Sequence, residues 1–199
     1  MIHEFPKLCP DDIPPLTLKD FDTPATAVEA DKHAKDIYRA VGVALSHWAT
    51  VEDDMATLFA AVLQTRSVAA HRALFAVISH RGRIEVIRAA AEVALRPHRE
   101  ILSDVTERLK ILSKAGARRN EIAHGRVTDY SENGRKIGCV LIPSLFDPRK
   151  MKESSGGYVY RYNTEIITGF ATKFRILHAQ LFDFVRGLEK LLPAFRPTP

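Results

Sequence analysis

The apolar residues between positions 30 and 64 recur at helical spacing. When successive residues are placed about 100° apart, the apolar side chains fall on one stripe and the polar ones opposite it. The stripe consists of Ile37, Val41, Ala44, Leu45, Trp48, Val51, Met55, Leu58, Phe59, Val62 and Leu63. Glu52 lies inside this stripe. A carboxylate in that position needs a cationic partner or a proton, because an isolated buried charge is costly.

The same periodicity predicts three further helices, over residues 68–95, 98–124 and 164–192. The helix over 68–95 is apolar on more than one side, so we expect it to be largely buried, with Gly82 as the point where it would kink. Gly125 follows the helix over 98–124. It suits the residue after a helix end, where a left-handed backbone conformation favours glycine.

The period changes between the third and fourth predicted helices. Residues 136–142 (KIGCVLI) and 156–163 (GGYVYRYN) alternate as β-strands do. We therefore expect a β-hairpin over about 136–163. The predicted fold class is mainly α: a four-helix up-down bundle with a β-hairpin inserted before the last helix.

Composition places this bundle in an ordinary intracellular setting. Prolines and acids in residues 1–28 predict an extended N-terminal arm, residues 29–193 form the bundle, and 194–199 form a tail. Cys9 and Cys139 are too few for a disulfide framework and suit a reducing compartment. There is no basic-then-apolar leader and no apolar run of roughly 20 residues, as a membrane span needs. We expect a cytoplasmic protein.

The net charge of +5 is spread unevenly along the chain. Residues 1–31 are acidic, whereas in residues 66–88 Glu85 is the only acid among several arginines. Such a basic stretch is a modest indication of nucleic-acid binding, although solvated arginine faces are commoner. Arg81 and Arg83 are candidate contacts for an RNA backbone, with plain solvent exposure as the commoner role.

The helix over 98–124 ends in the sequence RRNEIAH, which is unusually polar. On the helical wheel Asn120 falls near the centre of the apolar stripe, with Arg119 and His124 at its margins. Arg118 and Glu121 are predicted to point to solvent. Asn120 and His124 are four residues apart, close enough for the amide to orient the imidazole. The commoner role of such a histidine is to satisfy free carbonyls at a helix end.

Glu52 and Arg119 each need a partner of opposite charge, so we predict that they meet. The acids of the EDD sequence are not expected to form a magnesium site. Glu52 faces inward whereas Asp53 and Asp54 are predicted to face out, so the three side chains do not converge. The histidines and cysteines show no HExxH or CxxC spacing. We therefore expect neither a metal nor another cofactor.

The ending R-N-x-x-x-H-G resembles the HEPN superfamily, whose signature is an arginine, usually followed by a polar residue, with a histidine several residues further on. Arg119, Asn120 and His124 match this signature. The stretch HWATVE, which contains Trp48 and Glu52, is also similar to small prokaryotic members. A hairpin between the third and fourth helices is not a general feature of that superfamily.

The resemblance implies a metal-independent endoribonuclease that acts as a homodimer, in a toxin or defence role, with RNA as substrate and an antitoxin or regulatory protein as a further partner. Arg119, Asn120 and His124 would be catalytic, and Glu52 would support them. Two alternatives stay open. One is a non-catalytic HEPN-like module that binds a protein or nucleotide partner. The other is an unrelated helical domain whose RNEIAHG is a capped helix end.

Overall fold

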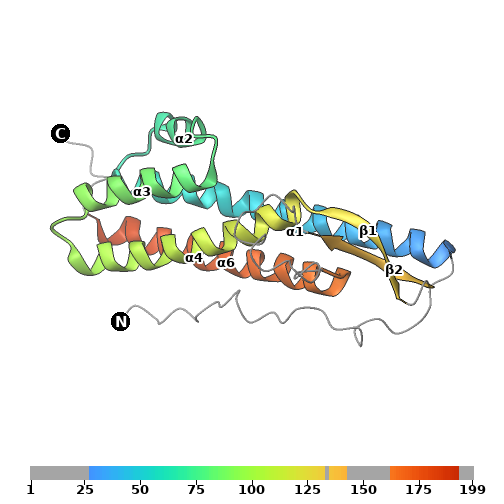
Figure 1. Cartoon of the computed structure of the whole chain (residues 1–199). Coiled ribbons are helices and arrows are strands. Elements are labelled where there is room, and N and C mark those ends of the chain that lie inside the picture. Colours follow the sequence, from blue (N-terminus) through green and yellow to red (C-terminus); the bar gives the residue numbers. More distant parts are fainter. Residues whose placement is uncertain (1–26, 133–134, 143–161, 193–199) are drawn as a thin grey trace, which may run out of the picture. The chain divides into compact units, whose positions relative to one another are not determined.

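The computed structural model describes residues 27–132, 135–142 and 162–192. The predicted N-terminal arm and C-terminal tail, apart from a few residues, and most of the predicted strand 156–163 lie outside these residues. The described part is mainly helical, with five helices and one two-stranded sheet that precedes the last helix (Figure 1). The predicted fold class, a helical bundle with a β-hairpin before its last helix, is confirmed.

Three of the helices match their predicted ranges closely. The five helices are α1 (Ala27–Val62), α2 (Val68–Phe75), α3 (His80–Ala94), α4 (Arg99–Ala123) and α6 (Thr164–Leu191). The strands are β1 (Arg126–Glu132) and β2 (Arg135–Ile142). Among the described helices, none is long and apolar enough to span a membrane.

The chain divides into two compact units, and the boundaries within the described residues fall inside helices α1, α4 and α6. The described residues of the first unit are 47–116 and 174–192. The described residues of the second unit are 27–46, 117–132, 135–142 and 162–173.

The core of the first unit is organised around Trp48 on α1, which is 1% exposed. Its ring meets the rings of His80 and Phe174 edge-on, with centroids 5.2 and 5.1 Å away. The Nε2 atom of His80 lies 3.1 Å from the carbonyl oxygen of Leu112. A Cβ at Gly116 would lie 2.3 Å from the His80 ring, so α4 carries glycine where the imidazole packs against it.

The predicted helix over 68–95 is in fact two helices, and the break does not lie at Gly82. It lies just before Ser79, whose side chain accepts a hydrogen bond from the Gly82 nitrogen at 3.0 Å and caps the start of α3. A Cβ at Gly82 would lie 2.8 Å from Val77 Cγ1. Gly82 therefore lets the first turn of α3 pack under the preceding loop.

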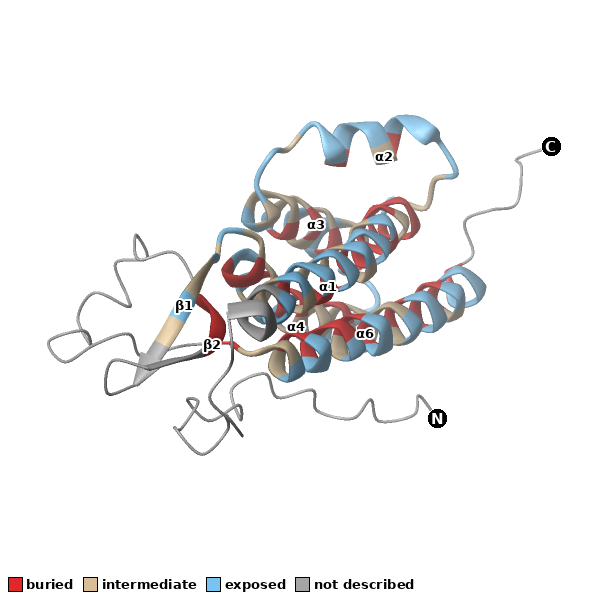
Figure 2. Ribbon diagram, turned by 90° about the vertical axis from the view of Figure 1, so that its right-hand side faces the viewer, coloured by how far each residue is buried: buried red, intermediate tan, exposed pale blue. Residues whose placement is uncertain are grey.

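The expectation that this region is largely buried was also wrong. α2 buries only Ala70 and Leu74, because a helix of eight residues has little room for a packed face. Figure 2 shows most of α2 as exposed. The large apolar side chains that remain accessible between Val68 and Ala94 are Val68 (68%), Phe75 (40%), Ile78 (95%) and Val93 (78%).

The described residues contain a hairpin over 126–142, whose first strand was not predicted, whereas most of the predicted partner strand 156–163 lies outside them. β2 pairs with β1 in antiparallel register, Arg126 opposite Ile142. Of the second predicted strand, Tyr162 forms an isolated antiparallel bridge to Leu141, with N···O distances of 2.8 and 2.9 Å. β1 was not predicted because its sequence, RVTDYSE, is largely polar and lacks a clear apolar alternation. The Asn-Gly dipeptide between the two strands was the signal that could have revealed it.

Candidate functional site

The buried face of α4 changes along its length. In the first unit α4 buries Val105, Leu109, Leu112, Ala115 and Gly116. In the second unit it buries Glu121 and Ile122, whereas Asn120 is exposed. Continuing the stripe around the wheel predicted the reverse for Asn120 and Glu121, and that prediction was wrong. The last turns of α4 have different neighbours, Tyr162 among them, so the inward face is no longer the one that the apolar stripe marks.

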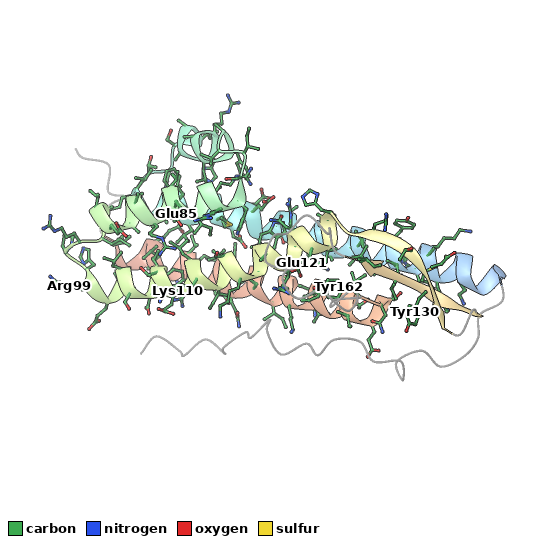
Figure 3. All side chains as sticks on the ribbon, in the orientation of Figure 1. Glu85, Arg99, Lys110, Glu121, Tyr130 and Tyr162 are labelled. Carbon is green, nitrogen blue, oxygen red and sulfur yellow. The ribbon has the colours of Figure 1, made fainter. Side chains whose placement is uncertain are left out.

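Glu121 is the centre of a polar cluster in the second unit (Figure 3). The Tyr162 hydroxyl donates to Glu121 Oε2 at 2.6 Å, and Arg118 Nη1 lies 3.0 Å from the same oxygen. Glu121 is 9% exposed and Tyr162 4%. Arg118 was predicted to point to solvent, but its guanidinium is committed to this carboxylate. Burial, reinforced by the hydrogen bond to Glu121, raises the pKa of Tyr162, so the phenol remains a donor.

Arg119, the next residue, is held in a different way. Its Nη1 atom donates to Asn120 Oδ1 at 3.0 Å, and its Nε atom is buried, in agreement with the predicted inward turn. Asn120 was expected to orient His124, but within the described residues its side-chain oxygen meets Arg119 instead. His124 is exposed. Its backbone nitrogen donates to the Asn120 carbonyl at 3.0 Å, so helical geometry continues up to the histidine.

Gly125 ends the helix through close packing rather than through a left-handed conformation. Its φ does not lie in the left-handed region, so the predicted role was wrong. A Cβ here would lie 2.7 Å from Leu141 Cγ and 2.8 Å from the Glu121 carbonyl oxygen. Only glycine lets β2 approach the end of α4 this closely, and the chain turns into the hairpin directly after the exposed His124.

The other predicted site residues lie in the first unit. Glu52 Oε1 is 3.1 Å from Arg83 Nη1, and both side chains are mostly buried, at 19% and 14% exposure. Arg83 Nε also donates to the Val77 carbonyl at 2.8 Å. Arg83 is therefore not the solvated arginine that was expected, whereas Arg81 is exposed. The predicted pairing of Glu52 with Arg119, a residue of the other unit, stays a prediction.

One ionisable pair of the first unit was missed altogether. Asp54 is 7% exposed, and its Oδ2 lies 2.6 Å from Nδ1 of the half-buried His178 on α6. Asp54 was predicted to face out, which was wrong because α6 packs on that side of α1. Burial raises the pKa of Asp54, and the hydrogen bond and charge of His178 oppose that rise. The two residues are 124 positions apart, so no local pattern could have linked them.

The carboxylates and histidines do not gather further. Within the described ranges no group of three or more His, Cys, Asp or Glu side chains is arranged to hold a metal ion. Comparison of the chain with protein-family models, curated proteins and solved structures finds no match. The resemblance to HEPN proteins thus rests on the motif residues themselves.

Proposed function

We propose that the protein is a metal-independent endoribonuclease whose active site is formed by Arg119, Asn120 and His124. The observation that carries this proposal is the difference in solvent exposure among these three side chains. His124 and Asn120 are exposed at the end of α4, whereas Arg119 is half-buried and tied to Asn120 by a 3.0 Å hydrogen bond. An accessible imidazole and a positioned guanidinium on the same helix end are the kinds of group that phosphodiester cleavage requires.

The exposure of His124 argues against the plainer role of a helix cap. A capping histidine uses its ring on the free carbonyls of the last turn. Among the described residues, the His124 ring has no such hydrogen bond, and the helix end is instead closed by the packing of Gly125 against Leu141. The imidazole is therefore available to an external ligand.

In the proposed reaction, the phosphoryl group of an RNA phosphodiester is transferred from the 5′-oxygen to the neighbouring 2′-oxygen. The 2′-oxygen attacks the adjacent phosphorus, and His124 takes the proton of the 2′-hydroxyl. The bond from phosphorus to the 5′-oxygen breaks, and a protonated histidine gives the leaving oxygen its proton. The products are a 2′,3′-cyclic phosphate and a 5′-hydroxyl. Arg119 donates to the phosphoryl oxygens and stabilises the charge that develops on them.

A single histidine cannot serve as base and acid at the same moment. A homodimer would supply a second His124 for the other proton, which is why we propose a dimer as the active form. Asn120 acts here on Arg119, because its oxygen accepts from that guanidinium. Arg118 is excluded from the proposed catalytic set, since Glu121 holds it at 3.0 Å.

The test is an assay of full-length protein on labelled mixed-sequence RNA in excess chelator. Wild type should cleave and leave 2′,3′-cyclic phosphate ends, and His124→Ala should lower the rate by at least about a hundredfold. His98→Ala, which changes another exposed histidine, is the matched control and should cleave normally. Cleavage that needs added metal, or that survives in His124→Ala, would overturn the proposal. No cleavage by wild type would favour the non-catalytic binding module.

A further inference from the structure

The first unit carries a basic surface that the proposed active site does not use. Residues 63–83 contain four arginines and no aspartate or glutamate. α2 lies within this stretch, and its outward side holds Val68, Arg72 and Phe75, which share one face of the helix. All three residues are exposed, and Figure 2 shows most of α2 in the colour of exposed residues.

The Phe75 ring on this surface packs against the guanidinium of Arg83. The Arg83 guanidinium carbon lies 5.0 Å from the centroid of the Phe75 ring, over its face. That guanidinium is itself fixed, since Nη1 meets Glu52 at 3.1 Å and Nε donates to the Val77 carbonyl at 2.8 Å. Phe75 nevertheless remains 40% exposed. One face of the ring is thus supported by a fixed guanidinium, and part of Phe75 remains accessible.

Further groups extend this surface. Ile78, in the loop after α2, is 95% exposed, and Arg72 and Arg81 are exposed before and after it in the chain. We call Arg72, Phe75, Ile78 and Arg81, with Arg83 behind Phe75, the α2 platform. It combines an aromatic face, an apolar neighbour and two exposed cations, and residues 63–83 contain no carboxylate.

We infer that the α2 platform binds single-stranded RNA by stacking an unpaired base on Phe75. Arg72 and Arg81 contact the flanking phosphates, and Ile78 packs against the neighbouring nucleotide. Arg83 is a positioning residue, which holds the ring rather than the RNA. The inference rests on the proposed function only in taking RNA as the polyanion, and it names the form of RNA that the protein recognises.

The chemistry of the platform selects an unpaired strand. In a duplex the faces of the bases are covered by their neighbours, so an aromatic side chain can stack only on bases that are splayed out. A purely apolar polypeptide would fit Ile78 and Val68, but it would leave the exposed Arg72 and Arg81 without complementary charge. A nucleic-acid strand matches both the ring and the arginines.

The test measures binding of full-length protein to a labelled 2′-O-methyl RNA of about 10 nucleotides, which cannot be cleaved through its 2′-oxygen. Phe75→Leu, which keeps an apolar side chain but removes the ring, should weaken binding by at least about tenfold. Phe75→Trp should bind within about threefold of wild type, and its fluorescence should be quenched by the bound strand. A duplex of the same sequence should bind weakly.

Two further variants separate the roles of the arginines. Arg83→Lys keeps the charge but loses the planar fork that reaches both Glu52 and Val77, so it should weaken binding about as Phe75→Leu does. Arg72→Ala with Arg81→Ala should reduce the salt dependence of binding by about 0.7 in log–log slope for each lost phosphate contact. Arg99→Ala, an exposed arginine at the start of α4, is the charge-matched control.

The outcomes are independent of cleavage, because the probe is not a substrate. Wild-type affinity in Phe75→Leu, or equal affinity for duplex and single strand, would overturn the stacking inference. Unchanged RNA binding in Phe75→Leu combined with loss of self-association would assign the surface to docking of a second copy instead. If Phe75→Leu loses binding and the wild-type protein does not cleave RNA, the α2 platform would stand and only the proposed activity would be refuted.

Discussion

Each unit of the protein contains a glutamate that holds an arginine, and the two pairs differ in what they do. In the first unit Glu52 on α1 meets Arg83 on α3, 31 residues away in the sequence. In the second unit Glu121 meets Arg118 one turn earlier on the same helix, and Tyr162 donates to the same carboxylate oxygen. The first pair joins two helices, whereas the second lies within α4 and is joined to the segment after the hairpin by the hydrogen bond from Tyr162.

The difference shows how a carboxylate can select which arginine reaches a ligand. Glu52 immobilises Arg83 under the Phe75 ring, so the cation supports a surface. Glu121 instead draws Arg118 inward, and the adjacent Arg119 donates to Asn120 Oδ1 at 3.0 Å. Neighbouring arginines in the sequence thereby acquire different roles.

The largest effect is expected from breaking the second pair. Glu121→Ala leaves both Arg118 and the buried Tyr162 hydroxyl without this acceptor, and removing one partner from a buried cluster is expensive. We expect a loss of about 3 kcal/mol in the free energy of unfolding, measured by urea denaturation. Glu121→Gln, which keeps an acceptor oxygen, should lose distinctly less. Equal and small losses would mean that the cluster does not stabilise the second unit.

Breaking the first pair should have a smaller effect. The carboxylate of this pair is less buried than that of the second pair, since Glu52 keeps 19% side-chain exposure against 9% for Glu121, so solvent compensates part of the lost interaction. We expect Glu52→Ala to lower the free energy of unfolding by about 1 kcal/mol. Glu92→Ala, an exposed acid on α3, is the control and should change little. A larger loss for Glu52→Ala than for Glu121→Ala would reverse the comparison.

Tyr162→Phe sharpens the comparison because it removes one hydroxyl from the three-membered cluster. We expect a loss of about 1 kcal/mol near neutral pH, the typical net value of a hydrogen bond. The pKa of Tyr162 is raised above its ordinary value of 10.0, so its stabilisation is complete below pH 10 and is lost as the pH rises further. The gap in stability between wild type and Tyr162→Phe should narrow above pH 10. A constant gap would contradict the burial of this phenol.

The smallest effect concerns a carboxylate paired with histidine instead of arginine. Asp54 has a raised pKa, so its contribution to stability is greatest at acid pH and declines as the pH rises from about 3.8 through the raised value. Asp54→Asn lacks this titration but keeps an acceptor for His178. Its stability relative to wild type should therefore improve as the pH rises through this window, by less than about 1 kcal/mol. A relative stability that falls instead would show that ionised Asp54 is net stabilising.

Much of the fold could be predicted because long amphipathic helices have apolar residues at regular helical spacing. α1, α4 and α6 each have a sustained apolar stripe, and their predicted ends were close. α2 and α3 were merged because the apolar residues around position 76 continue without a break, although Ser79 was a visible cap signal. β1 was missed because its side chains are mostly polar.

The sequence names the candidate site residues, but it does not give the orientation of all their side chains. Arg119 was predicted to turn inward and is half-buried, whereas His124 was placed at the opposite margin of the apolar stripe and is exposed. The wheel failed at Asn120 and Glu121 because it assumes one set of neighbours along the whole helix, whereas α4 has different neighbours in each unit. Contacts such as Asp54 with His178, or Glu121 with Tyr162, depend on tertiary packing and leave no mark on local sequence.

The most direct measurement compares the cleavage rates of Arg119→Ala and Arg118→Ala on labelled RNA in excess chelator, at temperatures where both full-length variants are folded. If Glu121 withdraws Arg118 and leaves Arg119 as the phosphate ligand, Arg119→Ala should lose at least about a hundredfold in rate. Arg118→Ala should stay within about threefold of wild type despite lower stability. Equal losses in the two variants, or a loss confined to Arg118→Ala, would contradict the account.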